Sequence, residues 1–370
     1  MHEKFMKKAL KLAEKGAGYT NPNPMVGALI VKDGKIIGEG YHQKYGEAHA
    51  EVNALKNATE DVEGATMYVT LEPCSHYGKT PPCAKTIVEH GIGAVVIASE
   101  DPNPLVSGGG VKMLKAAGID VTTGILDAEN KVLNEIFFNY IRTKRPFVIL
   151  KTAMSADGKI ATRTNESKWI SNEKSRQFVH KLRHRVAAIM VGANTVFHDD
   201  PLLTSRVRDQ TTQNPIRIIL DTDGRTPLTS RLLSDKAART IIVTTNKVKA
   251  ETLKAFKEKG AEVLVTPLKN GNVDLTHLMG TLGEMGIDSI LLEGGAYVND
   301  SAMREGLIDK YYSFIAPKLI GGENAPTPIG GIGFAAIEET ITLRRIDVRT
   351  FDEDLLIIYE RGDRHVHRNH

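Results

Sequence analysis

The first apolar positions of the chain recur at the spacing of one helix face: Phe5, Met6, Ala9, Leu10, Leu12 and Ala13. Two apolar segments follow at residues 26–31 and 36–41, and Asp33-Gly34 between them is typical of a tight hairpin turn. The pattern therefore predicts an N-terminal helix followed by a β-hairpin.

Beyond the hairpin, helical and strand-like segments alternate. The expected helices lie at residues 49–58, from Pro81-Pro82-Cys83 onward, where Pro suits a first turn, and at 111–117. The expected strands lie at residues 65–71, 94–99 and 119–125. This ββαβαβ order predicts an α/β sheet covered by helices.

The second half of the chain alternates in the same way. Its expected strands lie at residues 147–154, 187–192, 216–221, 240–245, 263–266, 289–293, 311–316, 340–348 and 354–360. Its expected helices lie at residues 172–185, 248–259, 274–285 and 296–305. We predict a second α/β sheet whose late, strand-rich part forms antiparallel edges.

A length of 370 residues favours two domains. We place the first at residues 1–144 and the second at residues 145–362, joined at a short basic segment that ends in Pro146. Residues 363–370 continue a stretch rich in His, and we expect them to be a disordered tail.

Composition and charge argue against two classes of partner. The net charge is only +3, and residues 1–144 hold 16 Lys and Arg against 17 Asp and Glu, so neither half resembles a nucleic-acid binder. No apolar run approaches the ~20 residues that span a bilayer. The N-terminus runs directly into an amphipathic helix with no secretory signal, so we expect a reducing, cytoplasmic setting.

The strongest chemical signal is His49-Ala50-Glu51, followed by Pro73-Cys74 and then Cys83. One imidazole and two thiolates leave the fourth position of a tetrahedral Zn²⁺ open for water, and Glu51 is the acid/base beside it. Zinc nucleobase deaminases carry His-x-Glu and then Pro-Cys-x-x-Cys. Here the ligand order matches, but eight residues separate the cysteines in place of two. We predict that His49, Cys74 and Cys83 bind Zn²⁺.

The alternatives are a solvated helix for His49 and Glu51, and a disulfide or a buried apolar pair for the cysteines. Cys74 and Cys83 are the only cysteines of the chain, and in a reducing compartment ligation or catalysis is the better use of the pair.

Longer segments resemble one family. Residues 21–28, His49-Ala50-Glu51 and residues 71–83, with their wide cysteine gap, are similar to the bifunctional deaminase–reductases of riboflavin biosynthesis. The resemblance implies a cytidine-deaminase-like αβα sandwich in the first half. It also implies hydrolytic deamination of 2,5-diamino-6-(5-phosphoribosylamino)pyrimidin-4-one to the corresponding aminouracil.

The eight residues between the cysteines carry groups that suit a phosphate. They offer hydroxyl, imidazole and ammonium groups, with Gly78 permitting a tight turn. A plain polar loop is the alternative. The resemblance favours substrate phosphate and ribose binding by His76 and Lys79, with Asn23 and Asn103 as further substrate contacts.

Glycine-rich segments of the chain offer a weaker signal. No Gly-x-Gly-x-x-Gly follows a strand of the second half, and Gly108-Gly109-Gly110 is expected to be a plain loop. Glu293-Gly294-Gly295 joins an apolar strand to a helix, so its N–H groups suit a nucleotide phosphate, with a simple tight turn as the alternative.

Segments at residues 151–161, 168–170, 191–204 and 293–295 are similar to the reductase half of the same family. The resemblance implies a dihydrofolate-reductase-like α/β domain that uses NADPH to reduce the opened ribose to a ribityl chain. The nucleotide contacts that it implies are Ala153, Ile160, Ala161, Thr162, Arg163, Trp169, Thr195, Asp199, Gly294 and Gly295. The substrate contacts that it implies are Ser167, Arg183, Leu203, Arg206 and Glu293.

Hydride transfer to C1 of the sugar also requires a positioned proton donor. Lys151, Asp199 and Glu293 are the candidates, and a close pair of Asp199 with Asp200 would raise one carboxyl pKa enough for acid work. Arg183 and Arg206 suit a phosphate. Trp169, the only Trp, lies either against the nucleotide or in the core.

Two rival functions have their own requirements. An RNA or nucleoside base deaminase with an accessory nucleotide-binding domain would show a basic stripe or interleaved aromatics, and aromatic residues are only 6% of the chain. A structural zinc would need a fourth ligand, for which His42 and His76 are the nearby choices.

We expect a small phosphoribosylated pyrimidine as substrate, no nucleic-acid or membrane partner and, from the resemblance, a homo-oligomer.

Overall fold

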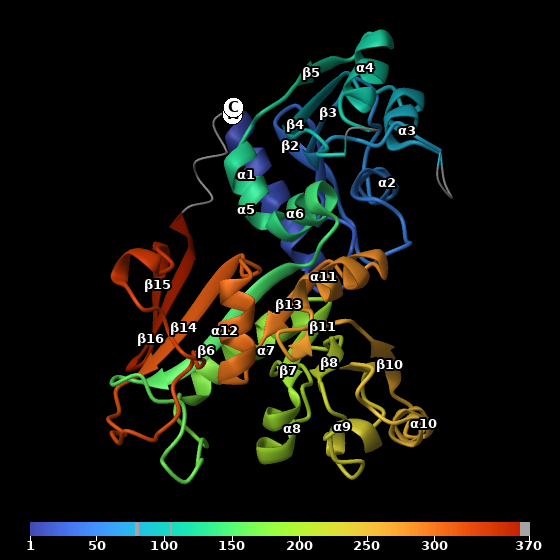
Figure 1. Cartoon of the computed structure of the whole chain (residues 1–370). Helices are drawn as coiled ribbons and strands as arrows, with labels where there is room; N and C mark the ends of the chain where they lie inside the picture. The colour runs from blue at the N-terminus through green and yellow to red at the C-terminus, as the bar shows by residue number, and fades with distance from the viewer. Residues whose placement is uncertain (78–80, 104–105, 363–370) are drawn as a thin grey trace. The chain divides into compact units, whose positions relative to one another are not determined.

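The computed structural model in Figure 1 describes residues 1–77, 81–103 and 106–362. Its contacts divide the chain into two compact units, Met1–Lys144 and Arg145–His370. The first unit ends where Lys144, with a φ of 55°, caps helix α6 (Glu135–Thr143) in the left-handed conformation. Pro146 then cannot continue a helix. The predicted tail at residues 363–370 lies outside the described residues.

The first unit holds five strands and six α-helices among its described residues. The strands are β1 (Gly27–Lys32), β2 (Lys35–Tyr41), β3 (Thr66–Leu71), β4 (Ala94–Ser99) and β5 (Asp120–Thr122). The helices are α1 (His2–Ala13), η1 (Glu14–Gly16, a 3₁₀ turn), α2 (Ala50–Lys56), α3 (Cys83–Glu89), α4 (Gly109–Ala116), α5 (Asp127–Leu133) and α6.

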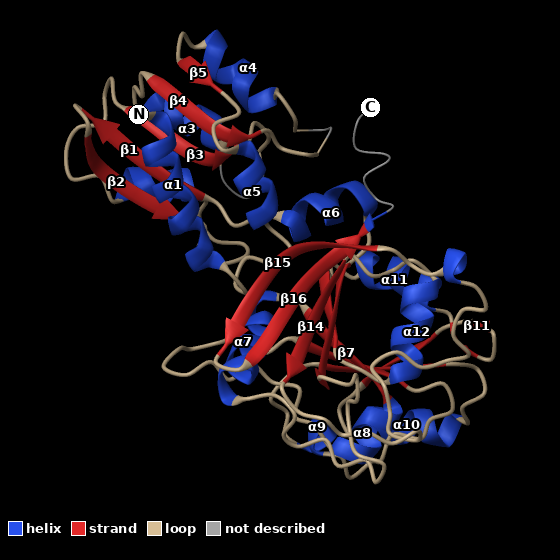
Figure 2. Cartoon of the chain, turned by 90° about the vertical axis from the view of Figure 1, so that its left-hand side faces the viewer, coloured by secondary structure: helices blue, strands red, loops and turns tan. Residues whose placement is uncertain are grey.

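The strands form one sheet in the order β2-β1-β3-β4-β5, with helices on both faces. Alternate residues of β1 enter different cores: Leu29 and Val31 pack with α1, whereas Ala28 and Ile30 pack with α2 and α3. Gly40 of β2 allows α2 to lie close, because a Cβ there would be 2.2 Å from the Ala54 nitrogen. The close approach fixes the helix that carries Glu51 against the sheet, whose strands β1 to β5 are labelled in Figure 2.

Most elements expected in the first half are confirmed. The hairpin turns through Asp33 and Gly34, which both have positive φ. The strand expected at residues 119–125 is shorter, Asp120–Thr122, and α5 and α6 after it were not predicted. The plain loop expected at Gly108-Gly109-Gly110 is wrong, because Gly109 and Gly110 begin α4.

The second unit contains a larger mixed sheet. Its strands are β6 (Phe147–Ser155), β7 (Ala188–Gly192), β8 (Ile216–Leu220), β9 (Thr240–Thr244), β10 (Glu262–Val265), β11 (Leu268–Lys269), β12 (Asn272–Val273), β13 (Ser289–Leu292), β14 (Lys310–Ala316), β15 (Leu343–Phe351) and β16 (Asp354–Arg361). Its helices are α7 (Glu173–Arg185), α8 (Ala193–Asp199), α9 (Arg231–Ser234), α10 (Ala250–Glu258), α11 (Leu275–Glu284), α12 (Ala296–Arg304) and η2 (Ile337–Glu339, a 3₁₀ turn).

Among the described residues, nine of these strands are ordered β10-β9-β8-β7-β13-β6-β14-β16-β15. The first seven strands in this order, which run across the sheet from β10 through β9, β8, β7, β13 and β6 to β14, pair in parallel. Strands β16 and β15 add antiparallel pairs at one edge, which confirms the predicted antiparallel edge. All five residues of β7 are buried, as expected for a central parallel strand. Because β6, β7 and β13 are parallel neighbours, their carboxyl ends lie along one edge of the sheet.

Helix α8 was not expected from the sequence, since its seven residues show little apolar periodicity. Among the described residues, no helix combines the length and the apolar character that crossing a bilayer requires.

Candidate functional site

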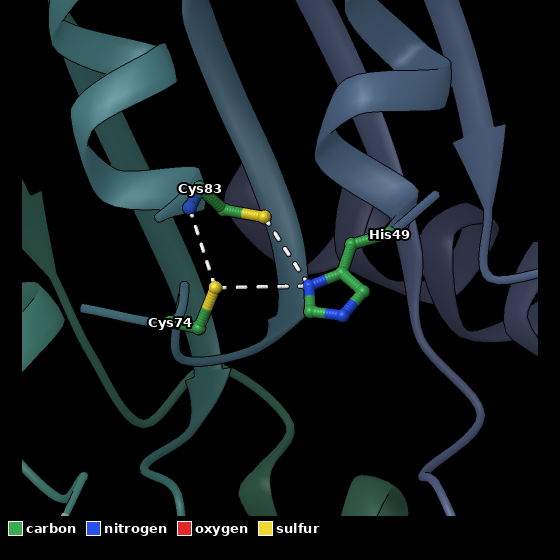
Figure 3. A group of neighbouring side chains, drawn as sticks. All are labelled: His49, Cys74 and Cys83. Atoms are coloured by element: carbon green, nitrogen blue, oxygen red, sulfur yellow. Dashed lines mark hydrogen bonds between the residues drawn. The ribbon is translucent and has the colours of Figure 1, made fainter. Parts of the chain in front are cut away.

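Three potential metal ligands meet in the first unit at the ends of secondary-structure elements. His49 is the N-cap of α2, Cys74 lies just beyond the end of β3, and Cys83 is the first residue of α3. Figure 3 shows the imidazole of His49 turned toward both sulfur atoms. The sequence placed His49 in the first helical turn, but its extended backbone makes it the residue before that turn.

The geometry of the three side chains fits Zn²⁺. Nδ1 of His49 lies 3.7 Å from Sγ of Cys74 and 3.3 Å from Sγ of Cys83, and all three ligand atoms lie within 4.8 Å of one another. Zn–S and Zn–N bonds of ~2.3 and ~2.05 Å at a tetrahedral angle require sulfur and nitrogen atoms to be about 3.6 Å apart. The trio therefore has the spacing of a tetrahedral site.

The electrostatics of the trio also suit a cation. The hydrogen bond from Cys83 and the nearby His49 lower the pKa of Cys74 to about 4, and the contact with Cys74 raises the pKa of His49 to about 9. A bound cation would take the place of protons on these groups, because thiolate and neutral imidazole are the ligating forms.

Glu51 lies on α2 beside this trio and is only 4% exposed. Burial raises the pKa of its carboxyl, although the imidazole of His49 opposes the shift. A carboxyl whose pKa moves toward neutrality is better suited to accept and return protons at physiological pH.

Neither histidine considered as a fourth ligand joins the trio, although the ring of His42 packs edge-on against the ring of His49, with the centroids 5.5 Å apart. His42 is buried, with Nδ1 3.1 Å from the Ala48 carbonyl oxygen and Nε2 3.3 Å from Nδ2 of Asn23. His76 is exposed. In the part of the chain that the structure describes, only His49, Cys74 and Cys83 form a group of possible metal ligands. The arrangement matches three protein ligands with an open position better than a closed structural site.

The candidate substrate contacts of the first unit lie on separate loops. Asn23 lies between α1 and β1 and contacts His42, a residue considered from sequence only as a zinc ligand. Asn103 follows β4, and its N–H donates to Oδ1 of Asp101 at 2.8 Å. Burial raises the pKa of the Asp101 carboxyl. Lys79, together with Gly78 and Thr80, lies outside the described residues.

Glu72, buried directly before Pro73-Cys74, was not predicted from the sequence. Its carboxylate accepts hydrogen bonds from backbone N–H groups of Asp101, Gly108, Gly110 and Val111. The available signal was the glycine triplet that begins α4, because free N–H groups at a helix start attract a carboxylate.

In the second unit the candidate residues gather at the carboxyl ends of β6, β7 and β13. Glu293, directly after β13, forms a two-bond ion pair with Arg183 of α7: Nε to Oε1 is 2.7 Å and Nη2 to Oε2 is 2.8 Å. Lys151 of β6 lies 3.9 Å from Oε2 of Glu293. The three side chains are 7%, 14% and 17% exposed for Glu293, Arg183 and Lys151, so this charge cluster is largely shielded from water.

The cluster holds Glu293 ionised. Burial alone would raise its pKa, but Arg183 and Lys151 outweigh burial and lower the pKa of Glu293 to about 2. Burial, with Arg183 nearby, lowers the pKa of Lys151. Of the three candidate proton donors, Glu293 is therefore held as a fixed anion, while Lys151 becomes a stronger acid than an ordinary ammonium group.

The strand–helix turn at Gly294-Gly295 has the conformation that glycine favours, with φ values of 134° and 73°. Gly294 accepts a hydrogen bond from the Gly192 N–H, which ties the turn to the end of β7. A Cβ on Gly294 would lie 3.7 Å from Oγ1 of Thr195 on α8. The structure thus brings three of the proposed nucleotide contacts, Thr195, Gly294 and Gly295, to the same edge.

The other proposed nucleotide contacts lie on β6 and after it. Ala153 is on β6, and Ile160 and Thr162 donate backbone hydrogen bonds to Pro326 and Glu166. Ala161 is buried, whereas Arg163 is exposed. Trp169 is 63% exposed, so it is not a core residue, and the Arg176 guanidinium lies 4.5 Å from its ring centroid.

Asp199 and Asp200 do not share one partner. Oγ of Ser167 lies 3.4 Å from Oδ1 of Asp199, whereas Asp200 accepts a hydrogen bond from the Arg231 N–H. Asp199 and Ser167 are proposed contacts of nucleotide and substrate respectively, and the structure places them together.

Two further proposed substrate contacts lie near Arg183. Leu203 is buried, and Arg206 is exposed. Partial burial together with Arg183 and Arg231 lowers the pKa of Arg206, and burial with Arg183 and Arg206 lowers the pKa of His180 to about 4. Neighbouring cations that lower one another's pKa values repel each other, and an anion such as a phosphate bound among them would relieve this repulsion.

Family models match both units. Residues 1–99 match the cytidine and deoxycytidylate deaminase zinc-binding region, and residues 146–357 match the RibD C-terminal domain. Curated relatives extend over both. The riboflavin biosynthesis protein RibD of Actinobacillus pleuropneumoniae is 48% identical over 96% of this chain and 94% of its own length. The corresponding protein of Aquifex aeolicus is 47% identical over 96% of this chain and 98% of its own length.

A solved structure is similar over the same span. The diaminohydroxyphosphoribosylaminopyrimidine deaminase/5-amino-6-(5-phosphoribosylamino)uracil reductase of Thermotoga maritima is 39% identical, with a TM-score of 0.87. The match covers 98% of this chain and 99% of that chain. The expected two-domain α/β architecture, with a deaminase-like first domain and a reductase second domain, is confirmed.

Proposed function

This chain belongs to the RibD family, the bifunctional zinc-dependent deaminases and NADPH-dependent reductases of riboflavin biosynthesis, and we propose how its residues divide the two reactions. We infer that the first unit deaminates 2,5-diamino-6-(5-phosphoribosylamino)pyrimidin-4-one. The second unit then reduces 5-amino-6-(5-phosphoribosylamino)uracil. The observation that carries the assignment is the convergence of His49, Cys74 and Cys83 beside the buried Glu51.

In the deaminase step, His49, Cys74 and Cys83 would hold Zn²⁺, which supplies Lewis-acid activation of a water molecule. Glu51 takes a proton from the attacking water and passes it to a ring nitrogen of the pyrimidine. It then delivers a proton to the departing amino group, so that ammonia leaves and a carbonyl remains. Asn23, His76, Lys79 and Asn103 hold the substrate; the polar character of the segment between the cysteines supports this role for His76 and Lys79.

In the reductase step, NADPH supplies a hydride to C1 of the sugar. The sugar ring opens, and the ring oxygen takes up one proton. Lys151 is our choice for that proton, because burial lowers its pKa, with Asp199 as the second candidate. Glu293 stays ionised and orients the substrate, Arg183 holds Glu293 in place, and Arg206 offers a cation to the phosphate.

The other reductase residues divide between nucleotide and substrate. NADPH would contact Ala153, Ile160, Ala161, Thr162, Arg163, Trp169, Thr195, Asp199, Gly294 and Gly295. Ser167 and Leu203 complete the substrate side. These assignments are supported by the position of the carboxyl ends of β6, β7 and β13 along one edge of the sheet, because ligands of such sheets usually bind there.

We also propose that the protein is cytoplasmic, acts on no nucleic acid and forms a homo-oligomer. The near-balanced charge supports a small-molecule substrate, and the two free thiols suit a reducing compartment. The edge strand β15 exposes Leu343, Ile346 and Val348, which suits pairing with a second copy. Sedimentation would reveal a monomer if the last of these proposals is wrong.

Incubation of the protein with the diaminopyrimidinone phosphate tests the assignment. Without NADPH we expect ammonia release alone, and addition of NADPH should then give one oxidised cofactor per deaminated substrate. A chelated sample should release no ammonia but still oxidise NADPH with the aminouracil supplied. Ammonia released from RNA, and not from the pyrimidine, would contradict the proposal.

A further inference from the structure

A single buried carboxylate joins three segments of the first unit. Glu72 is 4% exposed and lies two residues before the ligand Cys74. Its Oε2 accepts from the N–H groups of Asp101 at 3.3 Å and Gly108 at 3.0 Å. Its Oε1 accepts from Gly110 at 3.0 Å and Val111 at 3.2 Å. Each oxygen of the carboxylate therefore has two backbone donors.

The four donors lie on both sides of Asn103 in the sequence. Asp101 lies at the beginning of the connection between β4 and α4, and Gly108 lies at its end as the N-cap of α4. Within the connection, Asn103 donates its N–H to Asp101, and its carbonyl oxygen accepts from Val106 and Ser107. Glu72 thus holds Asp101 and Gly108, which lie on either side of Asn103 in the chain.

The beginning of α4 also touches the residues on both sides of Cys74. A Cβ on Gly110 would lie 2.0 Å from the carbonyl oxygen of Pro73, and one on Gly109 would lie 2.4 Å from Oγ of Ser75. Only glycine leaves room for this contact. The Glu72 N–H in turn donates to the Ser99 carbonyl oxygen at 2.9 Å, at the end of β4. Hydrogen bonds and close contacts therefore connect the residues around Cys74 with Asp101 and with the beginning of α4.

The arrangement requires a carboxylate. An amide of the same shape has one oxygen, and its NH₂ group would face two N–H donors without an acceptor. Charge adds to this requirement, because hydrogen bonds to an ionised acceptor are stronger than neutral ones and the helix start favours negative charge. A Gln at position 72 would keep the volume and lose half of the contacts.

We propose that Glu72 is a positioning residue of the deaminase, which fixes Asn103 relative to Cys74 and thereby sets the affinity for the pyrimidine substrate. The proposal rests on the proposed function, in which Asn103 contacts that substrate. Glu72 itself touches neither the substrate nor the metal ligands' donor atoms in this assignment.

The test compares Glu72→Gln with the wild-type holoenzyme and with Asp61→Asn. Asp61 is an exposed carboxylate of the same unit, whose partners are Lys32 and the Glu63 N–H. For Glu72→Gln we expect the deaminase KM to rise roughly 10- to 100-fold, the effect of losing hydrogen bonds to a charged group. The deaminase kcat, the zinc content and the reductase activity of Glu72→Gln should match the wild type. For Asp61→Asn these three quantities and the deaminase KM should all match the wild type.

Hydrogen exchange supplies a readout that does not depend on substrate. The amides of Asp101, Gly108, Gly110 and Val111 should exchange at least ~10-fold faster in Glu72→Gln, because each loses a charged acceptor. Gly110→Ala is a second variant with Glu72 intact, and it should raise the same KM by displacing α4 from Pro73.

Three results would overturn the proposal. They are an unchanged KM with unchanged exchange, a loss of zinc and kcat at constant KM, and a parallel fall of deaminase and reductase activity. If the wild type itself releases no ammonia from the pyrimidine, the proposed function fails instead, and hydrogen exchange alone then decides whether Glu72 holds these segments.

Discussion

Two buried glutamates, one in each unit, have opposite electrostatic surroundings. Glu51 is 4% exposed and the side chain of Glu293 is 7% exposed, so burial penalises the charge of both. The pKa of Glu51 is raised by burial, with His49 as its main opposing neighbour. The pKa of Glu293 falls to about 2, because Arg183 and Lys151 outweigh the same penalty.

The difference shows that partners, and not burial alone, decide what a buried carboxyl can do. A carboxyl with a raised pKa can take and return a proton, as the deaminase step requires. A carboxylate held by two cations keeps its charge and is suited to orient a substrate, so in the proposed assignment the proton of the reductase step comes from another group. Four substitutions or conditions test this contrast, from the largest expected effect to the smallest.

Removal of the proton-transfer group should have the largest effect. Glu51→Gln keeps the shape of the side chain but cannot exchange a proton, and we expect deaminase kcat to fall by roughly 10²- to 10⁴-fold. Zinc content and NADPH oxidation with the aminouracil should be unchanged. Ammonia release at the wild-type rate would show that Glu51 is not the acid/base.

Removal of the fixed anion should mainly destabilise the second unit. Glu293→Gln leaves the Arg183 guanidinium, with a side chain 14% exposed, without its charged partner. Breaking one side of a buried pair costs about 3–5 kcal/mol. Urea unfolding followed by circular dichroism should show an earlier transition, while deaminase activity should persist to the same urea concentration as in the wild type. A loss of both activities at one lower urea concentration would contradict the separation of the units.

Acid should remove the stabilisation that Glu293 supplies. The pKa of Glu293 in the folded chain, about 2, lies below the value of about 4.3 in an unfolded chain, so its ionised form stabilises the fold above pH ~4.3. This contribution, about 3 kcal/mol, is lost as the pH falls from ~4.3 toward ~2. The stability difference between wild type and Glu293→Gln should therefore shrink over that interval. A difference that does not vary with pH would indicate a loss of packing and not of charge.

An exposed pair of the same geometry should show the smallest effect. Glu262 binds Arg239 through two bonds of 2.6 and 2.7 Å, but the two side chains are 52% and 42% exposed. Water can replace either partner, so Glu262→Gln should change the free energy of unfolding by less than about 1 kcal/mol. Equal effects of Glu262→Gln and Glu293→Gln would mean that burial of the pair is irrelevant.

Much of the fold was predictable because its signals are local. The hairpin at Asp33-Gly34, the strands β3, β4 and β7 and the helix α7 follow from apolar periodicity and turn chemistry within a few residues. Prediction failed where the signal is weak or tertiary. Helix α8 lacks a clear apolar face, and the glycines that begin α4 pack against Pro73 and Ser75, which lie far away in the sequence.

The candidate site was predictable to a similar extent. The types and order of His49, Glu51, Cys74 and Cys83 are enough to indicate zinc chemistry, because few other uses suit those groups in that order. Glu72 was missed, and His42 was considered only as a zinc ligand, because their roles depend on partners. The donors to Glu72 come from residues 29 to 39 positions away, and no local pattern predicts such a meeting.

The sequence by itself determined which groups the protein possesses and the secondary structure that carries them, since periodicity and residue chemistry act over short distances. Only the tertiary structure decided the state of those groups. Glu51, Glu72 and Glu293 are the same residue type, yet one is suited to move a proton, one binds four backbone N–H groups and one is a fixed anion. Desolvation and charged partners make that difference, and distant segments of the chain supply both.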